Sequence, residues 1–103
     1  MSILFLDYLS INDLREVLEA VWEARAMWYN IGVCLHIPTG TLEAIQYDNR
    51  YVAEDCFRSM LKEWLKTEQP NTTWAALAEA MRSSIVGHEE LAVSLQLRLF
   101  KSS

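Results

Sequence analysis

The stretch that most constrains the fold is residues 50–68, RYVAEDCFRSMLKEWLKTE. Apolar side chains recur along it at helical spacing: Val52, Cys56, Phe57, Met60, Leu61, Trp64 and Leu65. In a helix of about 3.6 residues per turn these positions form one broad apolar stripe. A stripe of this width must be covered by neighbouring elements. The pattern therefore predicts a long amphipathic helix that begins near Arg50 and packs inside a larger structure.

The composition of the remaining chain favours further helices over strands. The 103 residues are 51% hydrophobic and 22% charged, which is typical of one globular domain. There are only three glycines and two prolines, and no Asn-Gly or Asp-Gly pair marks a hairpin turn. A sandwich or barrel needs many tight turns, so the composition predicts an all-α fold.

Start and stop signals divide the chain into six predicted helices. Ser10 is a helix N-cap with Asp13 three residues later, and Thr39 or Thr41 and Thr72 or Thr73 are further N-caps. Pro38, Asn49 and Gly87 are predicted to end helices. The predicted helices cover residues 11–24, 25–37, 41–48, 50–68, 73–86 and 88–100. Gly32 lies inside the second, where we expect a neighbouring helix to approach closely.

The predicted domain spans residues 10–100, with an apolar arm before it (residues 1–9) and a short tail after it (101–103). Leu97 and Phe100 lie off the inward stripe of the last helix and are expected to contact the arm. The opening MSILFLDYL has no basic region, so it does not match a secretory signal. No segment approaches the ~20 apolar residues that span a bilayer, so we expect no membrane insertion. A cytoplasmic location follows as the expectation.

The charge of the chain argues against two classes of partner. The formal net charge is −5 and the isoelectric point is about 4.9. Nucleic-acid binding draws most of its affinity from cationic contacts to phosphates, and anionic membranes likewise attract basic surfaces. The sequence predicts neither a general nucleic-acid binder nor a protein adsorbed to anionic lipid.

No arrangement of residues suggests catalysis, a cofactor or a metal site. Cys34 and Cys56 both lie in apolar helical patterns, which favours buried thiols over a disulfide. His36 and His88 are interpreted as surface or capping residues. Cys34 and His36 are two positions apart on a helix, so their side chains diverge. Two cysteines and two histidines show no familiar zinc spacing, and no glycine loop for phosphate is present. We expect no enzyme and no cofactor.

Several motifs, taken in order, carry a resemblance to a known family. They are Trp28-x-x-Ile31-Gly32-x-x-Leu35-x-Ile37, Leu42-x-x-Ile45, Met60-Leu61-x-x-Trp64-Leu65, Thr73-Trp74-x-x-Leu77-x-x-Ala80-Met81 and Leu91-Ala92-x-x-Leu95. Over about residues 12–97 the chain resembles the death domain of the death-fold superfamily. The resemblance implies a six-helix antiparallel bundle of Greek-key type.

Helical periodicity also predicts which side chains fill the core of that bundle. The expected core anchors are Trp28, Ile31, Leu35, Leu61, Trp64, Trp74, Leu77 and Leu95. Trp28 and Trp64 are expected to be large buried anchors, each worth about 3–5 kcal/mol relative to alanine.

The candidate interface residues are charged side chains on outer helix faces. Arg58, Lys62 and Lys66 are four apart on the long helix, and like charges at this spacing repel one another. The row is interpreted either as a solvated face or as an interaction patch. The same two readings apply to Glu16, Glu19 and Glu23 on the first helix.

The resemblance implies how such patches meet. Outer faces of the first and fourth helices contact those of the second and third in another copy. Charge complementarity would then set Arg58 and Lys62 against Glu43 and Asp48 of the next molecule. Tyr47 is either an aromatic anchor in this contact or a half-buried core residue.

Two functions from different classes follow. The first is an intracellular protein–protein interaction module that binds other death domains, itself or a different one, in apoptotic or innate-immune signalling as an adaptor or receptor tail. The alternative is a small helix-turn-helix DNA-binding domain. The fifth predicted helix carries only Arg82 and Glu79 as charged residues, which makes it a poor reader of a DNA groove.

Overall fold

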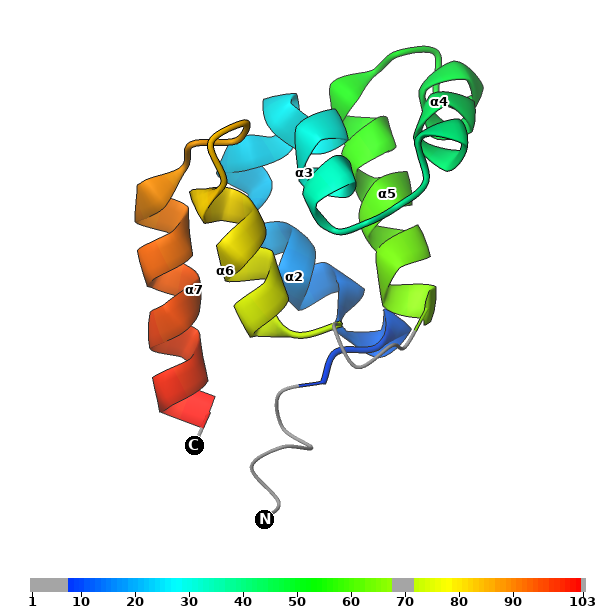
Figure 1. Ribbon diagram of the computed structural model, residues 1–103. Coiled ribbons are helices and arrows are strands. Elements are labelled where there is room, and N and C mark those ends of the chain that lie inside the picture. Colours follow the sequence, from blue (N-terminus) through cyan, green and yellow to red (C-terminus); the bar gives the residue numbers. More distant parts are fainter. Residues whose placement is uncertain (1–7, 68–71, 103) are drawn as a thin grey trace.

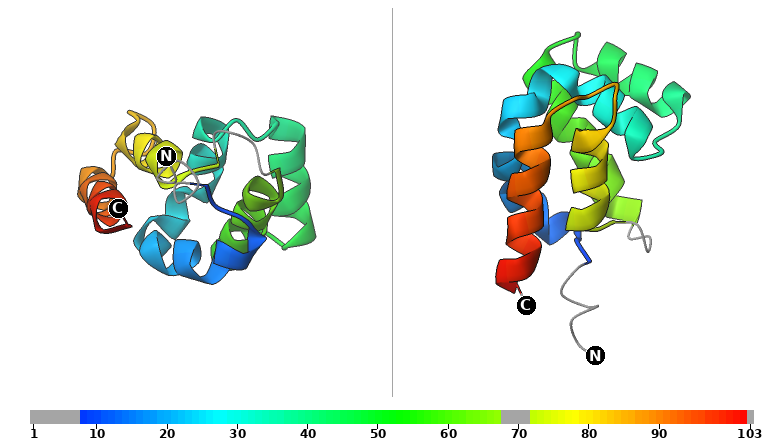
Figure 2. Two further views of the ribbon diagram at one scale, coloured as in Figure 1. Left: turned by 90° about the horizontal axis from the view of Figure 1, so that it is seen from below. Right: turned by 60° about the vertical axis from the view of Figure 1, so that its left-hand side comes forward.

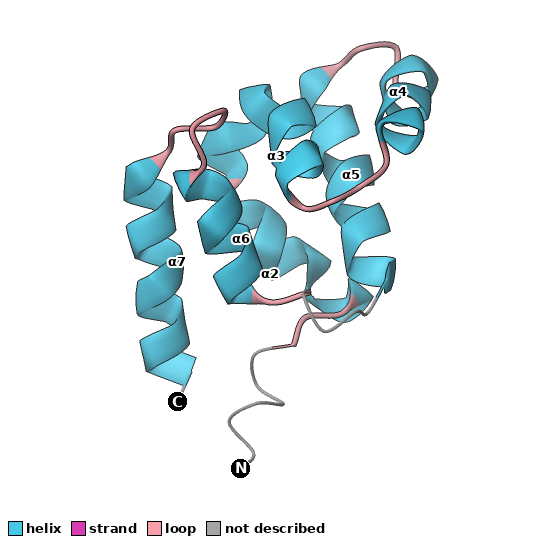
Figure 3. Cartoon of the chain, viewed as in Figure 1, coloured by secondary structure: helices cyan, strands magenta, loops and turns pink. Residues whose placement is uncertain are grey.

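The computed structural model describes residues 8–67 and 72–102, and the side chains among them up to residue 98 (Figure 1). These residues form six α-helices and two 3₁₀ helices, and their only extended pairing is an isolated bridge between Tyr8 and Thr73 (Figure 3). The elements are η1 (Ile11–Asp13), α2 (Leu14–Ala20), η2 (Trp22–Met27), α3 (Trp28–Cys34), α4 (Thr39–Asp48), α5 (Ala53–Thr67), α6 (Trp74–Arg82) and α7 (Glu89–Ser102). The predicted all-α, six-helix fold is confirmed.

Helix α5 is the element against which most others pack. It contacts η1, α2, η2, α3 and α4, and it lies between α2 and α4 (Figure 2). Its stripe is buried as predicted through Cys56, Phe57, Met60, Leu61, Trp64 and Leu65. Val52 is the exception, since it precedes the helix and is 43% exposed. The predicted start near Arg50 is also wrong, because Arg50 and Tyr51 adopt left-handed backbone conformations, and the helix begins only at Ala53.

The predicted first helix, residues 11–24, is wrong as one continuous element. Helix α2 ends at Ala20, Val21 leaves helical geometry with φ −119° and ψ 17°, and the chain rewinds as the 3₁₀ helix η2. Three residues per turn bring Val21 and Ala24 onto one side, and both are buried. The Arg25 guanidinium donates a hydrogen bond of 2.9 Å to the Trp22 carbonyl in the first turn of η2.

Capping predictions are confirmed at two helix starts and wrong at a third. Ser10 and Asp13 form a capping box, in which the Ser10 N–H donates to the Asp13 carboxylate at 2.8 Å. The Thr73 hydroxyl accepts from the Ala76 N–H at 3.0 Å and caps α6. Helix α4 instead begins at Thr39 directly after Pro38, without a side-chain cap, because proline at the preceding position already has a suitable φ of −56°.

The end of α6 also differs from the prediction. The helix stops at Arg82 rather than near Val86, since Ser83 turns extended. The residues that follow form a hydrogen-bonded turn in which the Gly87 N–H donates to the Ser83 carbonyl at 2.7 Å. Gly87 has a φ of +63°, so it completes this turn in the left-handed region that glycine tolerates best.

Gly32 allows α3 and α4 to approach as expected. A Cβ atom placed on Gly32 would lie 2.6 Å from the Leu42 Cδ2 and 3.2 Å from the Met60 Cγ. Both neighbours are fully buried, so neither side chain has free space into which to move.

Gly32→Val should therefore destabilise the domain by about 2–3 kcal/mol, because overpacking outweighs the gain in helix propensity. Urea unfolding checks this. Gly40→Ala is the matched control, since a Cβ at Gly40, also helical, meets no atom within 4 Å. That control should leave stability unchanged or raise it by up to about 1 kcal/mol. A Gly32→Val protein as stable as the wild type would contradict the close approach.

Helices α6 and α7 form an antiparallel hairpin beside the rest of the bundle (Figure 1). Leu91, Ala92 and Leu95 are buried in it. Arg98 ties the hairpin to α2, since its guanidinium lies 3.1 Å from the Glu16 carboxylate and stacks 5.1 Å from the centre of the Trp74 ring.

The predicted core anchors are all buried. Their exposed fractions do not exceed 8% for Trp28, Ile31, Leu35, Leu61, Trp64, Trp74, Leu77 and Leu95. The core also contains Leu9, whose N–H donates to the Thr72 carbonyl at 2.8 Å.

The division into arm, domain and tail stays a prediction. Arm residues 1–7 lie outside the described residues, and so does the Phe100 side chain that was expected to contact them. Leu97 is 54% exposed. None of the helices in the described part of the chain combines the length and apolarity that a membrane crossing needs.

Candidate protein-interaction surfaces

The cysteines and histidines form no reactive cluster within the described residues. No group of three or more His, Cys, Asp or Glu side chains there has a geometry that holds a metal ion. Cys34 and Cys56 are free thiols. The Cys34 Sγ donates to the Ser83 hydroxyl at 3.1 Å. Burial, and secondarily the Asp55 carboxylate, raises the pKa of the Cys56 thiol, which keeps it protonated and unreactive at neutral pH.

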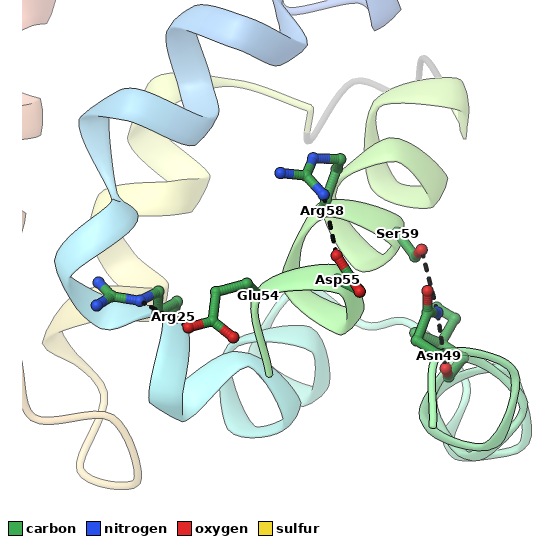
Figure 4. Close-up of polar contacts among 7 residues, drawn as sticks. Arg25, Asn49, Glu54, Asp55, Arg58 and Ser59 are labelled. Atoms are coloured by element: carbon green, nitrogen blue, oxygen red, sulfur yellow. Dashed lines mark hydrogen bonds and ion pairs between the residues drawn. The ribbon is translucent and has the colours of Figure 1, made fainter. Parts of the chain in front are cut away.

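The cationic row predicted on α5 is exposed and only weakly paired. Arg58 lies 3.2 Å from the Asp55 carboxylate, and Figure 4 shows this contact on the outer face of the helix. Lys66 lies 3.9 Å from the Glu63 carboxylate. Lys62 forms no ion pair with any described residue. Exposed pairs of this kind contribute about 0–1 kcal/mol each, so the row remains available to a partner.

Arg58 borders a hollow between α2 and α5. This α2–α5 hollow is lined by Leu18, Glu19, Trp22 and Arg58. Two predicted interface residues, Glu19 and Arg58, are thus brought together. Glu19 also lies 3.5 Å from Arg15, but both side chains are more than two thirds exposed.

The acidic residues of α2 do not form one patch. Glu16 does not line the α2–α5 hollow but pairs with Arg98 of α7. We interpret Glu16 as a residue that joins two helices rather than as an interface residue.

The predicted residues of α4 are all exposed. Tyr47 is 75% exposed, which excludes the reading of a half-buried core tyrosine. Glu43 and Asp48 are exposed as well, and neither forms an ion pair with a described residue. The outer face of α4 is therefore acidic, with an aromatic side chain beside the carboxylates.

A second hollow lies where α4 turns into α5. This α4–α5 corner is lined by Tyr47, Asp48, Arg50 and Tyr51. The Arg50 N–H donates to the Tyr47 carbonyl at 3.1 Å, and the Tyr51 N–H donates to the Gln46 carbonyl at 2.9 Å. These two bonds define a Schellman motif, in which Arg50, with φ 55°, occupies the position usually taken by glycine.

Sequence reasoning missed Arg50 and Tyr51 as surface residues. The sequence pattern predicts both at the start of a helix, because no glycine marks the turn after Asn49. Tyr51 is 67% exposed and has a φ of 65°.

Asn49 fixes the corner to α5. Its side-chain amide donates to the Ile45 carbonyl at 2.8 Å and to the Ser59 hydroxyl at 3.2 Å (Figure 4). On the far side of the same helix, Arg25 lies 3.7 Å from the Glu54 carboxylate and joins η2 to the start of α5. Both surfaces are thus supported by α5.

A bundle of six helices with charged outer faces and no reactive cluster among its described residues is an arrangement suited to protein binding. The model of the death domain family matches residues 11–98. The chain therefore belongs to the death domain family, and the resemblance seen in the sequence is confirmed. Comparison with curated proteins and with solved structures gives no significant match. Death domains are protein–protein interaction modules rather than enzymes.

Proposed function

We propose that this domain binds other death domains, including further copies of itself, through its charged helix faces. The cationic side of α5, with Arg58 and Lys62, meets the acidic face of α4, with Glu43 and Asp48, on the next molecule. The observation that carries the proposal is that the same chain exposes both faces, and that Lys62, Glu43 and Asp48 have no ion-pair partner among the described residues.

The overall charge makes the cationic row distinctive. The chain carries nine Lys and Arg against fourteen Asp and Glu, so a line of three cations stands out on an acidic molecule. Complementary charges of this kind raise association rates and fix the register of contact more than they raise affinity. Tyr47, 75% exposed, supplies the aromatic anchor that such contacts favour.

The positions of the two faces decide the type of assembly. Helix α5 lies between α2 and α4, so the two faces are different surfaces of one molecule (Figure 2). A contact between unlike surfaces is heterologous, and its repetition generates open, helical assemblies. We place this assembly in the cytoplasm, in apoptotic or innate-immune signalling, as the role of an adaptor or receptor tail; membership of the death domain family supports that setting.

Light scattering on the purified domain tests the proposal. We expect a mass above the 11.9 kDa of the monomer that increases with concentration and falls as salt is added, because exposed charge pairs are screened. A domain that remains monomeric at every concentration, and that captures no labelled death domain in a pull-down, would contradict it. A salt-sensitive shift of duplex DNA would instead favour the helix-turn-helix alternative.

A further inference from the structure

We infer that the α2–α5 hollow of one copy docks on the α4–α5 corner of a second copy, with Arg58 facing Asp48 and Glu19 facing Arg50. This inference rests on the proposed function. It adds a register to that contact, and it adds Arg50 and Tyr51 to the interface.

The two hollows carry matching sets of chemical groups. The α2–α5 hollow offers the Glu19 carboxylate and the Arg58 guanidinium, and the α4–α5 corner offers those of Asp48 and Arg50. Opposite charges meet at both positions only if Arg58 faces Asp48 and Glu19 faces Arg50. The other arrangement would set the carboxylates of Glu19 and Asp48 against each other, and likewise the two guanidinium groups. Arginine–carboxylate pairs are planar and two-pronged, so two of them together specify one orientation.

The backbone of the α4–α5 corner is unfavourable in isolation. Arg50 and Tyr51 are consecutive non-glycine residues with positive φ, although glycine would hold the same hydrogen bonds without strain. Asp48 is the last residue of α4, where a carboxylate meets the negative end of the helix dipole. Strained backbone and residues that are unfavourable for the local structure are typical of binding sites. The positive φ of Arg50, the positive φ of Tyr51 and the carboxylate of Asp48 are three such features around one hollow.

Aromatic side chains line both hollows. Tyr47 and Tyr51 are 75% and 67% exposed at the corner. Trp22 lines the other hollow. Its ring centre lies 6.3 Å from that of Phe57, and the Arg25 guanidinium lies 5.0 Å from the centre of the Trp22 ring, so both neighbours hold the indole in place. Tyrosine and tryptophan bury large areas at small cost in side-chain entropy, which makes them effective at the centre of a contact.

The charged groups are available for new partners. Glu19 and Arg58 each have one neighbour on their own helix, Arg15 at 3.5 Å and Asp55 at 3.2 Å, and these pairs are exposed by half or more. Exposed pairs contribute little to stability, so exchanging them for partners on another molecule costs little. Asp48 and Arg50 form no ion pair with a described residue.

Charge reversals in pairs test the register. Glu19→Arg, Arg50→Asp, Arg58→Asp and Asp48→Arg should each weaken self-association about tenfold or more in sedimentation velocity. Combining Glu19→Arg with Arg50→Asp in one chain should restore it, as should Arg58→Asp with Asp48→Arg. The mismatched combinations, Glu19→Arg with Asp48→Arg and Arg58→Asp with Arg50→Asp, should remain defective.

Two glycine substitutions provide a matched control for folding. His36, like Arg50, occupies a left-handed position that closes a helix, with φ 67° and its N–H donating to the Val33 carbonyl at 3.0 Å. Arg50→Gly and His36→Gly should both raise Tm, by about 2–6 °C, because glycine relieves the strain. Only Arg50→Gly should weaken association. Wild-type association in that variant would overturn the role of Arg50.

The outcomes separate the register from the proposed function. If reversing Arg58 and Lys62 together abolishes association but neither matched pair restores it, the register is wrong and the proposed function stands. If the wild type does not self-associate, the register is wrong, and if it also captures no labelled death domain, the proposed function falls with it. If mixing the Asp48→Arg chain with the Arg50→Asp chain restores association, the corner pairs with itself, and the docking on the α2–α5 hollow is wrong.

Discussion

Replacing Trp64 with alanine should unfold the domain. The indole is 4% exposed and belongs to the face of α5 that packs on the core, near Leu35 at the end of α3. Removing a buried aromatic side chain costs about 3–5 kcal/mol, which is a large fraction of the ~5–15 kcal/mol that stabilises a typical domain. Circular dichroism should show loss of helicity at 25 °C or a fall in Tm well beyond 10 °C.

Lys62→Ala is the control on the same helix. Lys62 is exposed and lies outside the core, so its truncation should change stability by no more than about 0.5 kcal/mol. A Trp64→Ala protein with a native spectrum and a Tm within a few degrees of this control would contradict the assignment of Trp64 to the core.

Reversing Arg58 and Lys62 together to glutamate should abolish self-assembly while leaving the fold intact. Both side chains are exposed on α5, and neither contributes to the core. The reversal turns the attraction to Glu43 and Asp48 into repulsion across the contact, which costs several kcal/mol. Light scattering should give the monomer mass, with helicity and Tm close to those of the wild type.

Added negative charge elsewhere should not have this effect. Val93 and Ser94 are exposed on α7, away from both faces, so Val93→Glu with Ser94→Glu controls for general repulsion. We expect this control to assemble as the wild type does. Wild-type oligomers in the Arg58→Glu, Lys62→Glu protein would remove these two residues from the interface.

The core was predictable from sequence because burial follows the helical period. Positions such as Ile31, Trp64 and Leu95 are separated by whole turns from other apolar residues, and a stripe of that kind has one inward direction. The capping box at Ser10 was likewise visible, because its two partners are three residues apart.

The ends of helices that no glycine or proline marks were not predictable from the sequence. Nothing in the local sequence marks the change from α2 to η2 at Val21, which occurs because Val21 and Ala24 both reach the core. Ser83 ends α6 four residues before Gly87, and the turn is joined to α3 where the Asn30 amide donates to the Ile85 carbonyl at 3.1 Å. Tertiary contacts decided both positions.

For the candidate interaction surfaces, the sequence predicts only which residues lie on the outer face of each helix. The period of α5 placed Arg58 and Lys62 outside the core, but it carried no information on which other element lies beside them. Glu16 and Glu19 are equivalent in the sequence pattern, but the fold brings Arg98, 82 residues away, against Glu16 alone. Arg50 was missed because a left-handed residue has no signature when it is not glycine.

A closed complex of two complementary variants tests most directly whether the cationic face of α5 docks on the acidic face of α4. A ¹⁵N-labelled chain with Arg58→Glu and Lys62→Glu keeps its α4 face, and an unlabelled chain with Glu43→Gln and Asp48→Asn keeps its α5 face. The neutral amides of the second chain do not attract the reversed α5 face of the first, so only one contact between the two chains can form. We predict that the two form a one-to-one complex and that amide resonances of Tyr47 and Tyr51 shift in the labelled chain while those of Val93 and Leu97 do not. Absence of a complex, or shifts centred on α7, would contradict the account.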